Sequence, residues 1–280
     1  MIVTIDSLDD PRVAEYRDVP DPERLRRHGV FVAEGRVVVR HLLASPRFET
    51  RSVLVSPPAL EGLRDAIEPR ADLPVFVMPV DRLTALVGFN IHRGCLAIGA
   101  RPAAAIVGDW WREASPGGLV VAAERVGNAD NLGALFRNAL AFGAGGILLS
   151  PGCCDPLYRK AIRVSTGAAL RLPYAIDEAW PGALQALRAA GARVLAMTPR
   201  LPARDLEDAV ASCVEGSPIV VLVGHEGDGL SGDAIAASDQ RVRIPLAPGV
   251  DSLNVSTAAA IALHACRRHI GRRKQFPSGT

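Results

Sequence analysis

The chain has 280 residues, of which 49% are hydrophobic, 5% aromatic and 22% charged, and its net charge is +2. This composition is typical of a soluble globular protein with an aliphatic core, and the length allows one large domain or two ordinary ones. No apolar run is long enough to span a bilayer, and the N-terminus lacks the basic-then-apolar order of a signal peptide. We therefore expect no membrane partner and a cytoplasmic location.

The positive charge comes almost entirely from arginine, because Lys160 and Lys274 are the only lysines. Arginine binds phosphates through two hydrogen bonds at once, so this bias is compatible with RNA binding. A net charge of +2 is nevertheless too small to identify a nucleic-acid partner by itself.

The cysteines are odd in number and have no CxxC spacing; they are Cys95, Cys153, Cys154, Cys213 and Cys266. The pattern predicts neither a disulfide framework nor a zinc site, and we expect no metal. The adjacent pair Cys153-Cys154 is expected in a loop, with small and partly buried side chains.

Residues 1–101 mix charged, helix-friendly stretches with short β-branched runs. DPERLRRHGVFVAEGRVVVRHLLAS is of the first kind, and RSVLVS and LPVFVMPV are of the second. This alternation predicts a small α/β domain. Residues 102–117 then pass through Pro, Ala and Gly and are interpreted as a linker, which Trp110 and Trp111 pack onto a domain or a partner.

From residue 118 to 270 the apolar runs become regular. They are GLVVAAERV, GGILLS, LRLPYAI, ARVLAMTP, IVVLVGHE and QRVRIPL, and stretches of helical period separate them, including NLGALFRNALAFG, ALQALRAAG and STAAAIALHACRRH. Strands that alternate with helices, each strand a continuous apolar run, predict a parallel sheet buried on both faces. Residues 271–280 are expected to form a basic, mobile tail.

Ligands of such a sheet bind outside the carboxyl ends of the strands, and three of these ends are followed by polar or glycine-rich loops. The first loop, GNADNLGALFRNA, carries Asn131, Gly133 and Arg137. Asn131 and Arg137 are six residues apart and face one site if a helix begins near Asn131. Alternatively, Asn131 caps that helix and Arg137 is a solvated residue.

The second loop is GHEGDGLSG, whose glycines allow a ligand to approach the backbone closely. It lacks the Lys-Ser/Thr ending of a phosphate-binding P-loop. Glu226 stands where a strand ends, so it either takes part in catalysis, pairs with an arginine or caps the next helix. We expect His225 to be structural rather than a general base.

The third loop opens GVDSLNVSTAAAIALHAC, where Ser, Asn, Ser and Thr precede a nearly apolar helix. One helix cap accounts for one such residue, but not for four in six positions, so the rest of the chain must decide between helix caps and a ligand at the helix start. All three loops are expected at one edge of the sheet. A dinucleotide-binding oxidoreductase is disfavoured, because the glycine run AFGAGG follows a helix and precedes a strand, the reverse of the required order.

Together the three loops resemble the motifs of the SpoU branch of the knotted SPOUT methyltransferases. The first motif is Asn131-x-Gly133-x-x-x-Arg137, the second is LVGHEGDGL and the third is IPLAPGVDSLNVSTAAAIAL. CCDPLYRKAIRVSTGAALRLPY is similar to the stretch that the family carries between motifs one and two. FVAEGRVVVRHLLAS and RGCLAIGARP resemble the ribosomal-protein-like α/β module with which many members bind RNA.

The resemblance implies a fold, a cofactor and an assembly. It implies an α/β protein in which residues 118–270 form a parallel-sheet SPOUT domain with a deep trefoil knot, a rare exception to unknotted folding. It further implies S-adenosylmethionine as cofactor, RNA as substrate, and a homodimer with the active site at the subunit interface. The implied cofactor residues are Gly224, Glu226, Gly229, Ile244, Leu246, Ser252, Leu253 and Asn254, and the implied catalytic residues are Asn131, Arg137, Glu226, Ser252 and Asn254.

The implied reaction is methyl transfer to a ribose 2′-hydroxyl of ribosomal or transfer RNA. Arg137 corresponds to the arginine that the family uses in catalysis, but a guanidinium with a pKa above about 12 is a poor base. We therefore expect it to orient the ribose or a phosphate and to stabilise the developing alkoxide. A base nitrogen as the target, and a non-catalytic protein that binds RNA or ribosome precursors, are the alternatives.

Contacts to RNA are also expected from the N-terminal domain. The candidates are Arg24, Arg26, Arg27 and Arg36. The competing interpretation is a solvated face on which Asp21, Glu23 and Glu34 balance these charges, and for any single arginine it is the preferred one.

Overall fold

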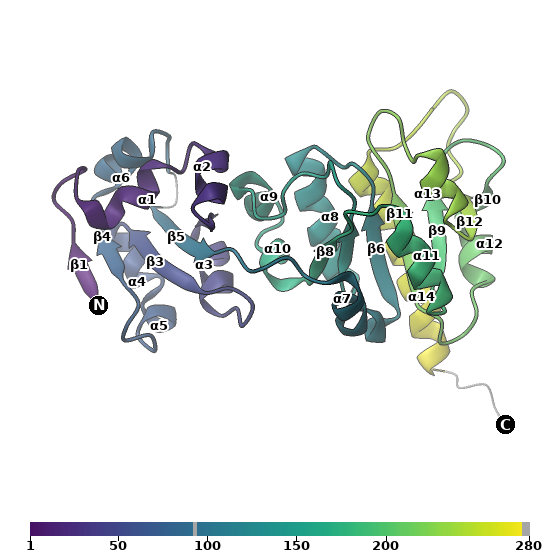
Figure 1. Ribbon diagram of the computed structural model, residues 1–280, viewed down its shortest axis with the longest axis horizontal. Coiled ribbons are helices and arrows are strands. Elements are labelled where there is room, and N and C mark those ends of the chain that lie inside the picture. Colours follow the sequence, from purple (N-terminus) through teal and green to yellow (C-terminus); the bar gives the residue numbers. More distant parts are fainter. Residues whose placement is uncertain (92–93, 276–280) are drawn as a thin grey trace. The chain divides into compact units, whose positions relative to one another are not determined.

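The structure is a computed structural model that describes residues 1–91 and 94–275. Its chain divides into two compact units, of which the first comprises Met1–Ala103 and Asp155–Arg171 and the second comprises Ala104–Cys154 and the chain from Leu172 onward. Two separate stretches of sequence therefore build each unit. Figure 1 shows the elements of both units in the colours of the sequence.

Unit 1 contains a mixed sheet of five strands in the order β1-β4-β3-β5-β2. Its strands are β1 (Ile2–Thr4), β2 (Val30–Glu34), β3 (Thr50–Val55), β4 (Val75–Val77) and β5 (Cys95–Ala100). β5 runs antiparallel to β2 and β3, and the remaining pairs are parallel. The runs RSVLVS and LPVFVMPV, which predicted strands, contain β3 and β4.

Short helices complete unit 1. They are α1 (Ala14–Arg17), α2 (Pro22–Arg27), α3 (Arg36–Leu43), α4 (Pro57–Glu61), α5 (Arg64–Ile67), α6 (Val80–Val87), α9 (Arg159–Val164) and α10 (Ala168–Arg171), with the 3-10 turn η1 (Pro11–Val13). α9 belongs to the stretch Asp155–Arg171. It is held to the end of β2 by Arg159, which donates to Glu34 at 2.5 Å and stacks over Phe89, with 4.0 Å between the guanidinium carbon and the ring centroid.

Unit 2 contains a sheet of seven strands, all parallel, in the order β10-β12-β9-β11-β6-β7-β8. The strands are β6 (Leu119–Ala123), β7 (Ile147–Leu149), β8 (Tyr174–Ile176), β9 (Arg193–Met197), β10 (Arg204–Asp205), β11 (Ile219–Val223) and β12 (Gln240–Arg243). Each of the six apolar runs that predicted a strand holds one. The prediction of a parallel sheet is confirmed, and β10 is an additional edge strand.

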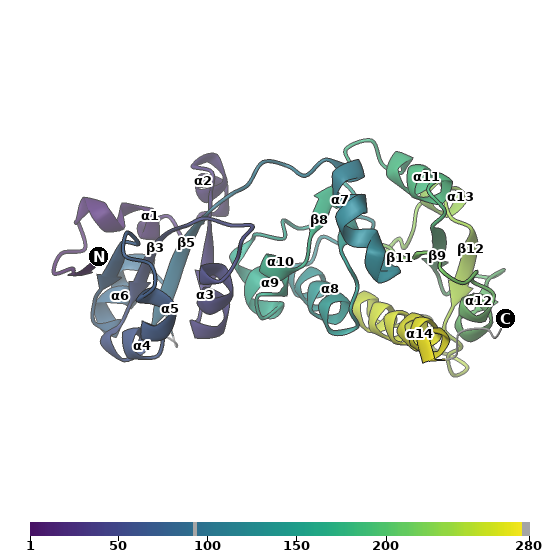
Figure 2. The ribbon, with the colours of Figure 1, turned by 90° about the horizontal axis from the view of Figure 1, so that it is seen from below.

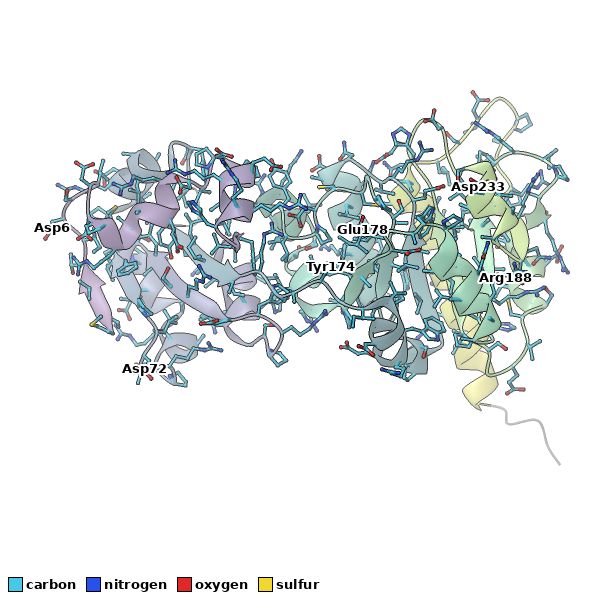
Figure 3. All side chains as sticks on the ribbon, viewed as in Figure 1. Asp6, Asp72, Tyr174, Glu178, Arg188 and Asp233 are labelled. Atoms are coloured by element: carbon cyan, nitrogen blue, oxygen red, sulfur yellow. The ribbon has the colours of Figure 1, made fainter. Side chains whose placement is uncertain are left out.

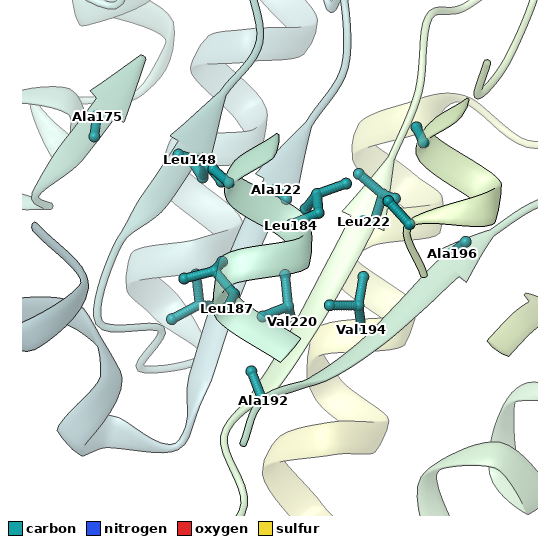
Figure 4. Packing of buried hydrophobic residues seen from close by; sticks show 14 of the residues in the cluster. Ala122, Leu148, Ala175, Leu184, Leu187, Ala192, Val194, Ala196, Val220 and Leu222 are labelled. Carbon is teal, nitrogen blue, oxygen red and sulfur yellow. The ribbon is translucent and has the colours of Figure 1, made fainter. Parts of the chain in front are cut away.

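The helices of unit 2 lie on both faces of this sheet (Figure 2), as the continuous apolar strands require. They are α7 (Val107–Ala114), α8 (Ala129–Ala141), α11 (Gly182–Ala189), α12 (Leu206–Ala211), α13 (Gly232–Ala236) and α14 (Val255–Gln275), with the 3-10 turn η2 (Ser115–Gly117). The close view in Figure 4 shows Leu184 and Leu187 of α11 packed on Val194, Val220 and Leu222 of the strands. Arg188 of the same helix, labelled in Figure 3, pairs with Asp239 at 3.0 Å.

Two segments differ from what their composition suggested. The expected linker contains α7, because its apolar residues recur at helical spacing between the flanking Pro and Gly residues, and Trp110 is buried in the core of unit 2. α14 continues through residues 271–275 of the expected tail, and residues 276–280 lie outside the described residues.

Candidate cofactor and active site

A cavity of about 420 Å³ opens in unit 2 beside four neighbouring strands of the sheet, β12, β9, β11 and β6. The segments that follow these strands supply its wall. They contribute Asn131, residues 197–200, residues 223–230, Ile235, Ile244, Leu246, residues 252–255 and Ala258. The structure thus brings the three loops to one edge of a parallel sheet, where ligands of such sheets bind.

The loop after β11 folds tightly against itself because of two glycines. A side chain on Gly224 would place its Cβ 2.5 Å from the backbone carbon of Gly229, and Gly229 has a φ of 74°. The imidazole of His225 holds the loop, since its Nδ1 accepts from the amides of Gly227 at 3.0 Å and Asp228 at 3.1 Å. These bonds give His225 a structural role in the loop.

Side-chain hydrogen bonds join the three loops at the cavity wall. Asn131 Nδ2 donates to Glu226 Oε1 at 2.7 Å, and Asn254 Nδ2 donates to Asn131 Oδ1 at 2.8 Å. Asn254 Oδ1 in turn accepts from the amide and the hydroxyl of Ser256 at 2.9 and 2.7 Å. We call Glu226, Asn131 and Asn254 the carboxamide relay; each amide in it uses its donor and its acceptor at once.

Some polar residues of these loops cap a helix, and others line the cavity. Asn128 caps α8, accepting from the amides of Asp130 at 2.8 Å and Asn131 at 3.3 Å, so the alternative that made Asn131 the cap is wrong. Asn254 caps the start of α14 and belongs to the relay as well. Ser252 lines the cavity and makes no hydrogen bond within the described part of the chain.

The expected site residues fall into two groups. Every residue expected at the cofactor lines the cavity, as do all those expected in catalysis except Arg137. Arg137 lies on α8 beyond Asn131 and is exposed, and its side chain has no hydrogen-bond or ion-pair partner among the described residues. In a single chain it is not part of the cavity wall.

One wall of the cavity and one buried support were not predicted from the sequence. The wall is residues 197–200, and the signal for it was available, because ARVLAMTP is a parallel strand with a carboxyl end at the same edge. The support is Glu124 at the end of β6, which is 3% exposed. It accepts from Trp180 Nε1 at 2.9 Å and from the amide and hydroxyl of Ser231 at 2.8 and 2.7 Å, and so fixes the end of the glycine loop.

Comparisons with known proteins agree with this arrangement. Residues 118–264 match the model of the SpoU rRNA Methylase family. A protein of Mycobacterium tuberculosis named as an uncharacterized tRNA/rRNA methyltransferase is 39% identical over 94% of this chain and 92% of its own length.

The chain belongs to the SpoU family.

Solved structures extend the similarity over nearly the whole chain. An rRNA methyltransferase from Sinorhizobium meliloti with bound AdoMet, 25% identical, covers 96% of this chain and 98% of its own with a TM-score of 0.79. An RNA 2′-O ribose methyltransferase, 26% identical, covers 96% of this chain and 99% of its own with a TM-score of 0.75. AviRb from Streptomyces viridochromogenes, a SpoU methyltransferase at 23% identity and a TM-score of 0.76, shares the fold.

The arginines expected at RNA lie on the surface of unit 1 of this SpoU protein. Arg24, Arg26 and Arg27 occupy α2, Arg36 begins α3, and all four are exposed. Arg24 pairs with Asp18 at 3.1 Å rather than with the acids expected to balance it. Of those acids, Asp21 caps α2, and Glu34 pairs with Arg159 and Arg163.

The cysteine, histidine and acidic side chains in the described part of the chain form no cluster suited to a metal ion. Within residues 1–91 and 94–275 no group of three His, Cys, Asp or Glu side chains could hold a metal ion. The five cysteines, all within these ranges, are reduced thiols, and Cys153 and Cys154 are half-buried in a loop, as expected. Burial raises the pKa of the Cys153 thiol. No helix in the described ranges is both long and apolar enough to cross a membrane.

Proposed function

We propose that this protein transfers a methyl group to a ribose 2′-hydroxyl of RNA, with S-adenosylmethionine as cofactor. The observation that carries the proposal is the carboxamide relay, which ties all three SpoU motifs together at one cavity. A protein that only binds RNA has no need for such a joined set of polar groups beside a cofactor-sized cavity. The ribose target is further supported by the similarity to a 2′-O ribose methyltransferase of known structure.

The residues around the cavity fit this cofactor. Its apolar wall, with Val223, Ile244, Leu246 and Leu253, suits an adenine ring, and the polar residues Glu226, Ser252 and Asn254 suit the ribose and the amino acid part. Gly224 and Gly229 carry no side chain that would keep a ligand from the backbone. We assign cofactor binding to these residues.

When bound, the cofactor supplies an electrophilic methyl group on a sulfonium. The protein's task is to align the ribose hydroxyl with that group, and such positioning contributes on the order of 7–11 kcal/mol when the geometry is right. The relay holds Asn131 and Glu226 fixed beside the cavity, so neither pays a reorganisation cost when the nucleotide arrives. Asn131 would hold the nucleotide or Arg137, and Ser252 has a free hydroxyl for the same task.

Arg137 acts as a cation and not as a base in this scheme. Its guanidinium orients the target ribose or a neighbouring phosphate and stabilises the alkoxide charge that develops as the proton leaves. An exposed arginine outside the cavity of its own chain is accounted for by a homodimer with the active site at the subunit interface. We include that homodimer, with the trefoil knot that the family resemblance implies, in the proposal.

Unit 1 is proposed to hold the RNA during the reaction. Arg26 and Arg27 have no ion-pair partner among the described residues, so their charges are available to phosphates. If several such arginines contribute, the affinity for RNA falls steeply with salt; a shallow dependence would count against this role.

Transfer of labelled methyl from S-adenosylmethionine to unmodified ribosomal and transfer RNA tests the proposal. After nuclease digestion we expect label in a 2′-O-methylnucleoside from one of the two pools. Label in a methylated base would show that the target is a base nitrogen and not the ribose. Cofactor binding by calorimetry without label in either pool would point to a missing substrate such as a ribosome-assembly intermediate, whereas no cofactor binding would favour the non-catalytic alternative.

A further inference from the structure

One arginine beside the cavity has an unusual backbone. Arg125, the second residue after β6, has a φ of 52°, and Arg125 and Thr166 are the two residues other than glycine with positive φ in the part of the chain described. Side chains with a Cβ rarely adopt this conformation, which costs free energy and tends to persist at functional sites. The position would be easier for glycine, so the side chain itself calls for an explanation.

The surroundings of Arg125 hold its backbone in place. The residues on either side, Glu124 and Val126, are 3% and 0% exposed. The amide of Arg125 donates to Ser150 Oγ at 2.9 Å, and Ser150 is itself buried. Since both neighbours are fixed in the core, the strained backbone turns the arginine side chain outward to the surface.

The guanidinium of Arg125 lies at the mouth of the cavity with a weak partner. Its NH1 is 4.0 Å from Asp228 Oδ2, and the two side chains are 45% and 75% exposed. An exposed pair at this distance contributes little, so a phosphate can displace the carboxylate at small cost. Asp228 lines the cavity, which places Arg125 at its rim.

A second arginine approaches the same residue from another loop. Arg200, which follows β9, donates through NH2 to the carbonyl oxygen of Asp228 at 3.3 Å, and it also lines the cavity. Both guanidinium groups are exposed and keep donors free. Two arginines that reach one residue at the mouth of the cavity provide positive charge that complements a polyanionic strand passing there.

We propose that Arg125 and Arg200 bind the phosphodiester backbone of the substrate RNA where the strand passes the mouth of the cavity. We call this pair of arginines the phosphate clamp. The clamp rests on the proposed function, because the RNA that it binds is the substrate whose ribose is methylated at that cavity. Asp228 acts as the exchangeable partner that holds Arg125 until a phosphate replaces it. The clamp positions the strand and does not take part in the chemistry.

Binding of labelled, unmodified ribosomal and transfer RNA at several salt concentrations tests the clamp. For Arg125→Ala we expect about tenfold weaker binding and a salt slope reduced by about one unit, as for the loss of one phosphate contact, and a larger effect for Arg125→Ala with Arg200→Ala. Arg125→Gly should weaken RNA binding equally while melting no lower than Arg125→Ala, because glycine adopts the backbone without strain. Arg241→Ala removes an exposed arginine of the same sheet, away from the cavity wall, and should change nothing.

Three results would overturn the clamp. The first is an RNA affinity and a salt slope that equal those of the wild type in both Arg125 variants. The second is weaker RNA binding with an unchanged salt slope. The third is a loss of calorimetric affinity for S-adenosylmethionine with RNA binding intact, which would assign the arginines to the cofactor. A wild-type protein that binds RNA but transfers no methyl group would contradict the proposed function. The RNA affinities of the wild type and the arginine variants would still test the clamp.

Discussion

Among single residues, Asn131 has the most connected position, because it is both donor and acceptor within the carboxamide relay. Asn131→Ala leaves Glu226 and Asn254 without their partner, and we expect kcat/KM to fall by about 10- to 100-fold, as for one or two hydrogen bonds to polar or charged groups. Steady-state kinetics with thermal unfolding checks this.

The neighbouring Asn128 serves as a control, because its substitution should affect stability more than activity. Asn128→Ala removes the cap of α8 and should lower the free energy of unfolding by about 1 kcal/mol. Its effect on kcat/KM should be smaller than that of Asn131→Ala. Equal losses of activity in the two variants would mean that Asn131 acts through helix stability alone.

Arg137→Ala should separate chemistry from folding. The side chain is exposed and has no partner among the described residues, so we expect an unchanged melting temperature and an unchanged calorimetric affinity for the cofactor. Turnover should fall about 10²-fold or more, as for the removal of one donor to a developing oxyanion. Single-turnover kinetics measures it, and near-normal turnover with intact RNA binding would remove Arg137 from the mechanism.

Among single residues, those within the three motifs could be predicted from the sequence, and few others could. Gly224, Ser252 and Asn254 could be placed at the cavity because they follow apolar runs whose carboxyl ends share an edge. Glu124 could not, because its role depends on Trp180 and Ser231, which come from distant loops. No local pattern distinguishes a carboxylate satisfied by three such donors from an ordinary strand-end acid.

Among the elements, the glycine loop after β11 makes the sharpest prediction. In Gly224→Ala the new Cβ would meet backbone atoms of Gly229 and Leu230 at 2.5 and 2.6 Å, and backbone cannot give way as a flexible side chain can. We expect at least tenfold weaker cofactor binding by calorimetry. The loop must shift to make room, and it forms one wall of the cavity.

A second glycine nearby serves as the matched control. A Cβ on Gly232, at the start of α13, would meet nothing within 4 Å, and its φ is not positive. Gly232→Ala should therefore leave cofactor affinity unchanged and stabilise the protein slightly. A normal affinity in Gly224→Ala would show that the loop is more pliant than its packing indicates.

Elements could be predicted where periodicity extends over several residues, and not elsewhere. The six buried strands were predicted because each is a continuous apolar run in an alternating β/α pattern. β10 is only two residues, Arg204–Asp205, and has no apolar signal. α7 was interpreted as linker because flanking Pro and Gly residues dominate the local composition, whereas the packing of Trp110 in the core of unit 2 determines its structure.

For the whole molecule, buried thiols predict a loss of stability in alkali. Burial, with Cys213 nearby, raises the pKa of Cys266 from 9.0 to about 12. The folded chain therefore keeps a proton that the unfolded chain releases above about pH 9, so the contribution is complete below that pH and is lost as the pH rises towards 12. The free energy of unfolding should fall by about 1.4 kcal/mol per pH unit from this group.

Urea unfolding between pH 8 and 11 measures the effect. Cys266→Ala should show a shallower decline than wild type, even if the cavity it leaves lowers stability at pH 8. The decline that remains in the variant includes Tyr16, whose pKa burial also raises. Parallel curves for the two proteins would contradict a buried neutral thiol.

Each unit is built from two separate stretches of sequence, and the exposed stretch 102–106 allows this to be tested. A protease site inserted there cuts the chain between Met1–Ala103 and the rest, while residues 155–171 of unit 1 remain on the second piece. We expect the cut pieces to coelute in gel filtration under native conditions. Separate elution would mean that residues 155–171 are dispensable for unit 1.

The same construction sets an order of events on the ribosome. Synthesis runs from the N-terminus, so β2 and its Glu34 leave the exit tunnel more than a hundred residues before Arg159 of α9. Unit 1 must wait, incomplete along this side, until β6, α8 and β7 of the other unit have been made. The nascent chain therefore cannot finish its first unit before it has begun its second, and the two must mature together.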